Sequence, residues 1–228
     1  MVVDDFNQPD GLITNERAFW SPTTAGTKHS PTWEMTSGSL FAKDGAAWTG
    51  RIDNRAPNAA SSNGTNSAVF RLVTKRKDYR NVNVRLRLRH EAFSSTSSTP
   101  PAAWDGAHVF LRYQSQESLY YASINRRDGA VVVKKKVPGG PSNGGTYYTL
   151  ATVRRSPAAT GAWVNYEASA QDQADGSVRI TVRINGTQVL SAVDHGTGGP
   201  VIRSGGVGLR GDNAQMSFDN FRIDNLGP

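Results

Sequence analysis

The sequence predicts an all-β fold, an antiparallel β-sandwich of two sheets, and three observations lead to that prediction. Apolar and polar residues alternate with a period of two in many short segments, which is typical of strands with one buried face. Turn-forming residues separate these segments at intervals of about ten residues. No window combines a helical apolar stripe with capping residues. Strands this numerous and this closely spaced favour a sandwich or barrel.

The alternation is clearest in two segments. In residues 81–90, aliphatic side chains occupy one face, and Arg85, Arg87 and Arg89 occupy the other. In residues 177–184, valine and isoleucine alternate with polar residues in the same way. Asp-Gly and Asn-Gly dipeptides bound the second segment and supply the positive φ angles of tight turns.

Eight further strands are expected in residues 67–74, 108–113, 119–126, 131–137, 163–170, 188–193, 206–210 and 215–223. Turns are expected between them, among others at residues 138–141 and 143–145. The Ser/Pro-rich stretch 94–101 lies between two expected strands and is interpreted as a loop. Because no stretch is typical of an interdomain linker, residues 1–228 are expected to form one domain.

Composition limits the possible chemistry. The chain contains no cysteine, which excludes disulfides, thiol nucleophiles and Cys-based metal sites. The N-terminus lacks the pattern of a secretion signal, and no apolar run is long enough for membrane insertion. The net charge of +7 favours anionic partners, acidic glycans among them, although a solvated basic surface explains it equally well. Specific binding of a nucleic acid is not expected.

Several motifs near the ends and in the middle point to a known superfamily. They are Asp4-Asp5-Phe6-Asn7, HVFLRY at 108–113, LYYASINRRDG at 119–129, Gly206-Val207-Gly208-Leu209-Arg210 and Phe218-Asp219-Asn220-Phe221. With these motifs the chain resembles the concanavalin A-like lectin/glucanase superfamily, including its laminin-G-like bacterial members. The resemblance implies a jelly-roll β-sandwich whose first and last strands lie side by side. Phe6 should then lie near Phe218 or Phe221 in the core.

A second resemblance concerns the composition of the chain and its N-terminus. A Met-initiated, leaderless, cysteine-free chain rich in Arg, Ala and Gly resembles the minor tail proteins of phages that infect actinobacteria. This resemblance implies a virion (phage tail) location, other virion tail proteins as partners and a homo-oligomer. An extracellular location is the alternative.

The strands 108–113 and 119–126 form the richest candidate site. Because Ala122 and Ile124 suit a core, Tyr121 and Asn125 are expected on the exposed face beside His108 and Arg112. An aromatic ring beside amide, hydroxyl and guanidinium donors is what sugar binding requires. Packing of Tyr121 at the rim of the sheet is the alternative.

Further candidates lie on other strands. Arg85 and Arg87 form a basic stripe whose guanidinium groups suit carboxylate or phosphate groups on a polymer, unless the stripe is an ordinary solvent-facing surface. Arg210 and Asp212 follow a strand that borders the binding groove in related folds. A salt bridge that fixes a loop is the alternative for this pair.

No catalytic residue is predicted. Hydrolases of the superfamily place paired carboxylates on a strand in an E-x-D-x-x-E run, and this chain has no such run. The full set of strand motifs of jelly-roll alginate lyases, Arg-x-Glu, Gln-x-His and Tyr-x-Lys-x-Gly, is also missing. No cofactor is required, but the resemblance implies a possible structural calcium where the termini meet, with Asp5 and Asp219 as its ligands. Hydrogen bonding to a loop is the alternative for Asp219.

The sequence therefore predicts a non-catalytic carbohydrate-recognition module that binds a cell-surface or polymeric glycan, in a phage tail tip that contacts the host envelope. A secreted polysaccharide lyase or glycoside hydrolase is one alternative. A purely structural tail component is another.

Overall fold

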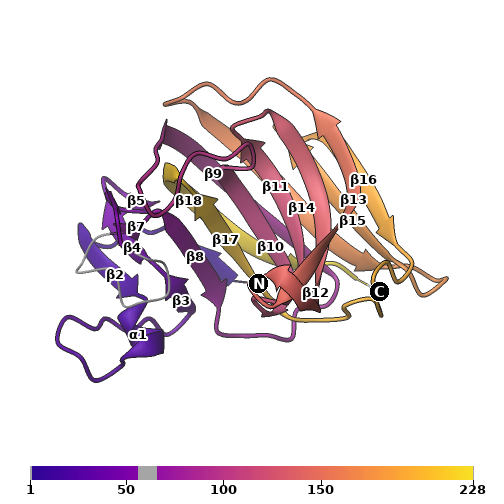
Figure 1. Cartoon of the computed structure of the whole chain (residues 1–228), viewed down its shortest axis with the longest axis horizontal. Helices are drawn as coiled ribbons and strands as arrows, with labels where there is room; N and C mark the ends of the chain where they lie inside the picture. Colours follow the sequence, from indigo (N-terminus) through magenta and orange to yellow (C-terminus); the bar gives the residue numbers. More distant parts are fainter. Residues whose placement is uncertain (1, 56–65, 228) are drawn as a thin grey trace.

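The prediction of an all-β jelly-roll sandwich is confirmed. A computed structural model describes residues 2–55 and 66–227, and it shows two antiparallel sheets that pack face to face (Figure 1). The nine-stranded sheet has the order β16 (Thr187–Asp194), β15 (Val178–Ile184), β14 (Trp163–Asp172), β9 (Val82–Phe93), β18 (Ala214–Asn225), β5 (Ala46–Trp48), β4 (Ser39–Lys43) and β2 (Gly11–Asn15), and β1 (Val2–Asp4) pairs with β18. The seven-stranded sheet has the order β13 (Gly145–Arg154), β12 (Ala130–Ser142), β11 (Ser118–Arg126), β10 (Gly106–Ser115), β17 (Gly206–Asp212), β8 (Val69–Thr74) and β3 (Trp33–Ser37). A short parallel pair, β6 (Ile52–Asp53) and β7 (Asn66–Ser67), and the helix α1 (Arg17–Trp20) lie outside these sheets.

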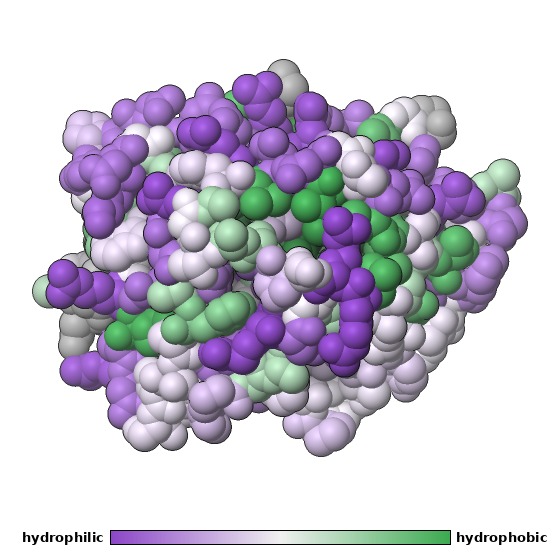
Figure 2. Space-filling model, turned by 90° about the horizontal axis from the view of Figure 1, so that it is seen from above, coloured by the Kyte–Doolittle hydropathy of each residue, from purple (hydrophilic) through white to green (hydrophobic). Residues whose placement is uncertain are grey.

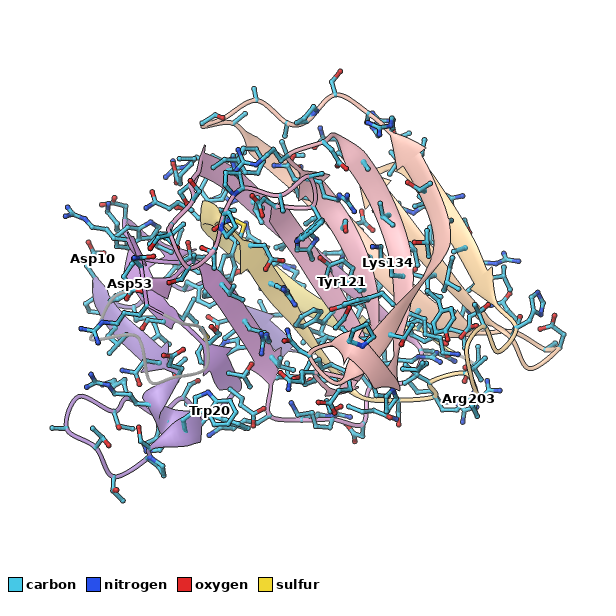
Figure 3. All side chains as sticks on the ribbon, in the orientation of Figure 1. Asp10, Trp20, Asp53, Tyr121, Lys134 and Arg203 are labelled. Atoms are coloured by element: carbon cyan, nitrogen blue, oxygen red, sulfur yellow. The ribbon has the colours of Figure 1, made fainter. Side chains whose placement is uncertain are left out.

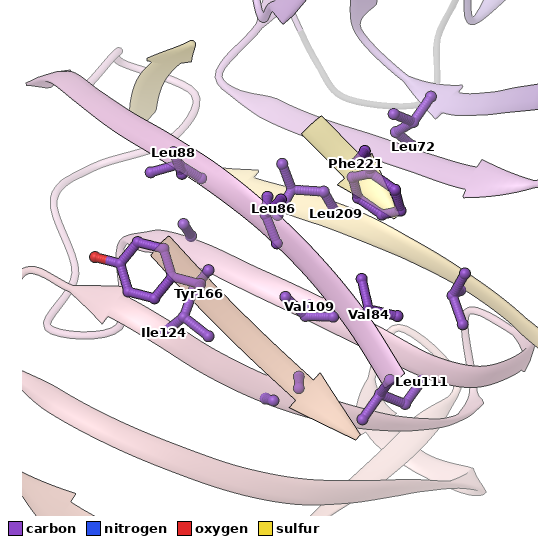
Figure 4. Close-up of a cluster of buried hydrophobic side chains, with 14 of the residues drawn as sticks. Leu72, Val84, Leu86, Leu88, Val109, Leu111, Ile124, Tyr166, Leu209 and Phe221 are labelled. Atoms are coloured by element: carbon purple, nitrogen blue, oxygen red, sulfur yellow. The ribbon is translucent and has the colours of Figure 1, made fainter. Parts of the chain in front are cut away.

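The core lies between the inner faces of the two sheets. Along β9 every second residue is buried, as the period-two pattern predicts. Val84 and Leu86 from β9 belong to the same buried cluster as Val109 and Leu111 from β10 (Figure 4). Because inward residues alternate with outward ones, each sheet also presents a second face to solvent.

The two ends of the chain meet, as the superfamily resemblance implies. Val2 pairs with Ile223 across β1 and β18. The ring centroids of Phe6 and Phe218 are 5.3 Å apart in an edge-to-face contact. Pairing of the first strand with the last also leaves fewer open edges for association.

The expected strands are present, with ends that differ by a few residues. Strand β13 and the short strands β1 to β7 were not predicted from the alternation. The turn predicted at residues 138–141 is wrong, because these residues extend β12 irregularly and the chain reverses at Asn143 and Gly144. Prolines and glycines are tolerated there because residues 138–141 extend beyond the part of β12 that pairs with β11, which ends at Lys136.

One face of the molecule is mostly polar. Seen from above the view of Figure 1, hydrophilic residues cover most of the visible face, and hydrophobic ones show in hollows between them (Figure 2). In the described part of the chain, no helix has the length and apolar character needed to cross a membrane.

Candidate functional site

A groove of about 430 Å³ lies on the outer face of the seven-stranded sheet, the face turned away from the core. Its lining combines aromatic, cationic and polar side chains: Trp104, Tyr121, Tyr147, Arg126, Lys134, Arg210, Asp212, Pro141, Ser142 and Asn143. In Figure 3 the labels of Tyr121 and Lys134 lie close together over the middle of the sheet. We call this hollow the groove throughout.

Strand register brings the floor of the groove together. Tyr121 on β11 pairs directly with Lys134 on β12. Arg210 on β17 pairs with His108 on β10, which pairs in turn with Ser123. Because side chains of directly paired residues point to the same face of a sheet, these residues form two adjacent rows across four strands.

The end of the β12–β13 hairpin forms one wall. Pro141, Ser142 and Asn143 reach the same hollow as Tyr121 because the hairpin extends beyond its neighbours and bends over the sheet face. This bend depends on Gly140, which has a φ of 140° and whose added Cβ would lie 2.0 Å from Thr146 Oγ1. Only glycine therefore fits at this position without a shift of the chain.

A loop before β10 forms the opposite wall and carries Trp104, which is 56% exposed. The buried carboxylate of Asp105 fixes this loop. Its Oδ2 accepts a hydrogen bond from the Ala102 N–H (2.9 Å) and forms an ion pair with Arg127 (3.1 Å). A large aromatic ring is thus held in solvent at the rim by a rigid anchor, which is unusual for a residue type that is usually mostly buried.

Arg210 and Asp212 form a paired fork in the groove. Two Arg210 nitrogens each donate a hydrogen bond of 2.7 Å to the Asp212 carboxylate. Burial acts to raise the pKa of Asp212, but interactions with the Arg210 guanidinium and with His108 together outweigh burial and lower that pKa. Burial likewise acts to lower the pKa of Arg210, but the nearby negative charges, chiefly Asp212, leave that pKa raised. Both groups therefore stay charged and offer fixed donors and acceptors to a ligand.

His108 lies beneath Tyr121 and is fully buried. The two rings stack with centroids 4.5 Å apart, and His108 Nδ1 is 3.0 Å from Ser123 Oγ. Burial lowers the pKa of His108, although Asp212 Oδ2 lies 3.3 Å from its Nε2. Burial raises the pKa of Tyr121. Both side chains are therefore neutral near pH 7, and the ring of Tyr121 is held in place from below.

Two lysines flank the ring of Tyr147. Lys134 and Lys136 alternate on β12, and their Nζ atoms lie 5.7 and 4.9 Å from the ring centroid. Tyr147 in turn lies 5.8 Å from Tyr121, centroid to centroid. Burial lowers the pKa of Lys134, and burial together with nearby arginines lowers that of Lys136 to about 8. The Lys136 ammonium also donates a hydrogen bond of 2.7 Å to the carbonyl of Gln116.

Of the site residues predicted from the sequence, Tyr121, Arg210 and Asp212 line the groove, and His108 supports it from below. The expectation that Tyr121 is exposed is wrong, because packing against His108 and Phe110 leaves it only 6% exposed at the floor of the groove. Asn125 lies at the end of β11, where it is 4% exposed and accepts a hydrogen bond from the Ala158 N–H (3.2 Å). It lines a separate, smaller hollow of about 140 Å³.

The expected position of Arg112 beside Tyr121 is wrong. A β-bulge interrupts β10 here, Arg112 has a φ of 49°, and its side chain turns away from the groove. The buried guanidinium donates to the carbonyls of Arg80 (2.9 Å) and Ile202 (2.8 Å) and to Asp172 Oδ1 on β14 (2.9 Å). Arg112 therefore holds the two sheets together.

The arginine stripe also lies elsewhere. Arg85 and Arg87 are on β9, on the outer face of the nine-stranded sheet, and they form part of no common site with Tyr121. Arg85 donates to Asp224 (2.9 Å from Nε) and Arg87 to Asp219 (2.6 Å from Nη2) on the neighbouring strand β18. Each charge is already balanced by a carboxylate.

Of the two predicted calcium ligands, Asp219 is a poor fit, whereas Asp5 Oδ1 is a buried oxygen to which no described residue donates a hydrogen bond. Asp219 Oδ2 accepts hydrogen bonds from the Arg87 guanidinium and Oδ1 accepts one from the Asn220 N–H (2.7 Å). A cation already occupies the side of the carboxylate that a metal would need. Among the described residues no three Asp, Glu, His or Cys side chains come together in a way that holds a metal ion. Calcium binding by these residues stays a prediction, and no role is derived from it.

Sequence reasoning missed Arg126, Lys134, Tyr147 and the hairpin end as parts of the site. No periodic signal identified Lys134, because residues 131–137 read Val-Val-Val-Lys-Lys-Lys-Val without alternation, and the structure buries the adjacent Lys135 against Asp194. The contribution of Tyr147 depends on β13, which the sequence analysis did not predict.

The fold and the groove define a jelly-roll sandwich of the concanavalin A-like and galectin-like type, with an aromatic and charged hollow on one sheet. Residues 19–224 match the 3-keto-alpha-glucoside-1,2-lyase-like domain, and the chain belongs to this family. No curated protein matches the sequence.

Several solved structures share the fold. The carbohydrate-binding module CBM66 from Bacillus subtilis is 13% identical, with a TM-score of 0.57, and the match covers 85% of this chain and 95% of that one. A protein with a galectin-like fold from Bacillus subtilis is 11% identical, with a TM-score of 0.58 and 98% of both chains covered. A mutant alginate lyase in complex with alginate trisaccharide is 10% identical, with a TM-score of 0.54 and 99% and 98% covered. At these identities the likeness concerns the fold alone.

Proposed function

We propose that this chain is a carbohydrate-recognition module and that it binds a glycan in the groove. The observation that carries the proposal is the lining itself. Trp104 and Tyr147 offer faces to the apolar C–H side of a sugar above the buried floor residue Tyr121, and the Arg210–Asp212 pair offers donors and acceptors to hydroxyl groups. The family match and the carbohydrate-binding module among the similar structures support a sugar as the ligand.

A comparison of two exposed tryptophans tests the proposal. Trp104 lines the groove, whereas Trp163 is 36% exposed on the outer face of the other sheet, over Arg87 and Arg89. We expect Trp104→Ala to weaken glycan binding in affinity electrophoresis against a polysaccharide panel, and Trp163→Ala to leave it unchanged. Equal loss in both variants, or no binding of any glycan by the wild type, contradicts the proposal. Absence of all binding favours a purely structural role.

Lyase activity is a second candidate function, which the family match and one side chain favour. An elimination needs a base close to the sugar, and the pKa of Lys134 is lowered by burial at the groove wall. Incubation with a 3-keto-α-glucoside or a uronate polysaccharide, followed by detection of new reducing ends or of absorbance from an unsaturated product, tests it. Turnover that Lys134→Gln abolishes establishes an enzyme. Absence of turnover with a bound glycan leaves the recognition module.

A more specific proposal concerns the location of the protein. We propose that the module acts in a phage tail and contacts the host envelope, where several copies convert weak single-site binding into firm attachment. Its basic, cysteine-free composition supports this setting. Detection of the chain in purified virions, or tail genes beside its own, is the expected result. Detection in a bacterial culture supernatant instead contradicts it and favours the extracellular alternative.

A further inference from the structure

The cations of the groove differ in what balances them. Arg210 is paired with Asp212, and Arg126 donates to both oxygens of Asp128 at 3.0 and 2.7 Å. Lys134 is the exception. Within the residues that the structure describes, its ammonium group makes no hydrogen bond and no ion pair, and it faces only the ring of Tyr147.

The surroundings of Lys134 make this lack of a carboxylate costly. The side chain is half-buried, and Arg126, a like charge, is close enough to disfavour its charged form. Asp128 is the acidic group whose charge acts to raise the pKa of Lys134, but both of its oxygens already accept hydrogen bonds from Arg126. A protonated amine in this position gains from any anion that enters the groove, because the anion supplies both a charge and a hydrogen-bond acceptor.

The position of Lys134 also determines what kind of anion fits. Its neighbours across the strands are the rings of Tyr121 and Tyr147, which lie 5.8 Å apart, centroid to centroid. An aromatic surface beside an ammonium group suits a sugar ring with an anionic substituent better than it suits a free inorganic ion, which has no apolar face to cover the rings.

We propose that the groove is selective for acidic glycans and that Lys134 binds the carboxylate or sulfate group of the sugar. This inference rests on the proposed function and names the class of ligand. The shared chemistry is an anionic group on a sugar whose ring lies against Tyr121 and Tyr147.

Matched polymers separate charge from sugar identity. Polygalacturonate and its fully methyl-esterified form share one backbone and differ in carboxylate charge, and dextran sulfate and dextran differ in sulfate. Affinity electrophoresis in gels that contain each polymer gives the retardation of the native protein. We expect stronger retardation by an acidic member than by its neutral counterpart, and the pair that shows it identifies carboxylate or sulfate.

The chain supplies a matched lysine for the control. Lys43 is exposed on β4 and lies 4.6 Å from the centroid of Trp48, so it has the same charge and the same kind of ring contact outside the groove. We expect Lys134→Gln to weaken binding of the acidic polymer about tenfold and Lys43→Gln to change it little. Because both variants lose one positive charge, a general electrostatic effect would lower both equally.

Three results overturn the inference. They are equal retardation by acidic and neutral members, equal loss in Lys134→Gln and Lys43→Gln, and binding of neutral glycans alone. In the last case the proposed function stands, and only the selectivity is wrong. Failure of every polymer to bind contradicts the proposed function itself and this inference with it.

Discussion

The arginine stripe of the nine-stranded sheet and Lys134 of the seven-stranded sheet differ in what balances their charge. Arg85 and Arg87 donate hydrogen bonds to carboxylates of the neighbouring strand β18. Lys134 lies beside the rings of the groove and has no carboxylate partner among the described residues. A row of arginines in the sequence is therefore a weak sign of a binding site, because the neighbouring strand decides which charges are available to a ligand.

The first prediction concerns the cost of breaking a pair on each face. Asp212→Asn leaves the Arg210 guanidinium largely buried without its carboxylate, and we expect a loss of about 3 kcal/mol in the free energy of unfolding. Asp224→Asn breaks the Arg85 pair, where the arginine side chain is 47% exposed, and should cost less than about 1 kcal/mol. Urea unfolding measures both. Equal losses would show that the two faces do not differ in this way.

The second prediction concerns pH, because the groove rests on a buried histidine. Burial lowers the pKa values of His108 and of His90, a core residue on β9, below the usual value of about 6.5. The unfolded chain then binds more protons than the folded one as the pH falls. Stability is thus fully present above about pH 6.5 and is lost below it, by at most about 1.4 kcal/mol per pH unit for each histidine.

Urea unfolding between neutral and mildly acidic pH measures this loss. His108→Gln should remove the share that comes from the groove, since glutamine does not titrate. The expectation is wrong if acidification stabilises the protein, or if the variant and the wild type show the same pH dependence.

The third prediction compares the two faces of one strand. Tyr147 and Tyr148 are adjacent on β13, and only Tyr147 lines the groove, while Tyr148 contacts Gly198 on the other side. Tyr147→Ala should weaken glycan binding about fivefold to tenfold through loss of the aromatic face, and Tyr148→Ala should not. Titration calorimetry with the best-binding polymer decides between them. Equal weakening would point to a general defect of the hairpin.

The smallest effect is expected on the paired face. Arg85→Gln with Arg87→Gln removes two exposed guanidinium groups whose carboxylates lie outside the groove. Binding of the preferred glycan should stay within about twofold of the wild type. Arg85 and Arg87 lie on the opposite sheet from the groove, and solvent ions screen exposed charges beyond a Debye length of about 8–10 Å. A strong loss of glycan binding in this double variant would place the ligand on the nine-stranded sheet and contradict the difference between the two faces.

The sequence was sufficient for the strands with strict alternation. In β9 and β15 the core face repeats without interruption, and the period of two fixes both the element and its buried side. Phe6 and Phe218 were placed near one another by the superfamily resemblance, and the pairing of β1 with β18 confirms it.

The site was harder to predict because two of its determinants leave no periodic signal. One is the β-bulge at Arg112, which inserts a residue into β10 and reverses the expected side of the guanidinium. The other is the hairpin end around Gly140, whose prolines and glycines are typical of a simple turn. Positive φ angles instead let the chain bend over the sheet and bring Asn143 to the groove. Alternation cannot reveal either feature, because both depend on where the pattern breaks.

The end of the β12–β13 hairpin is a part of the groove that can change without a change in the core. Its end belongs to the terminal strands of the sheet, and residues 138–141 are largely exposed, with no part in the buried core. Insertions and substitutions at such exposed tips are well tolerated, except at Gly140, whose backbone conformation requires glycine. The wall of the groove can therefore change in length and in side chains while Tyr121 and Lys134 stay in place, so that the shape of the groove varies on an unchanged scaffold.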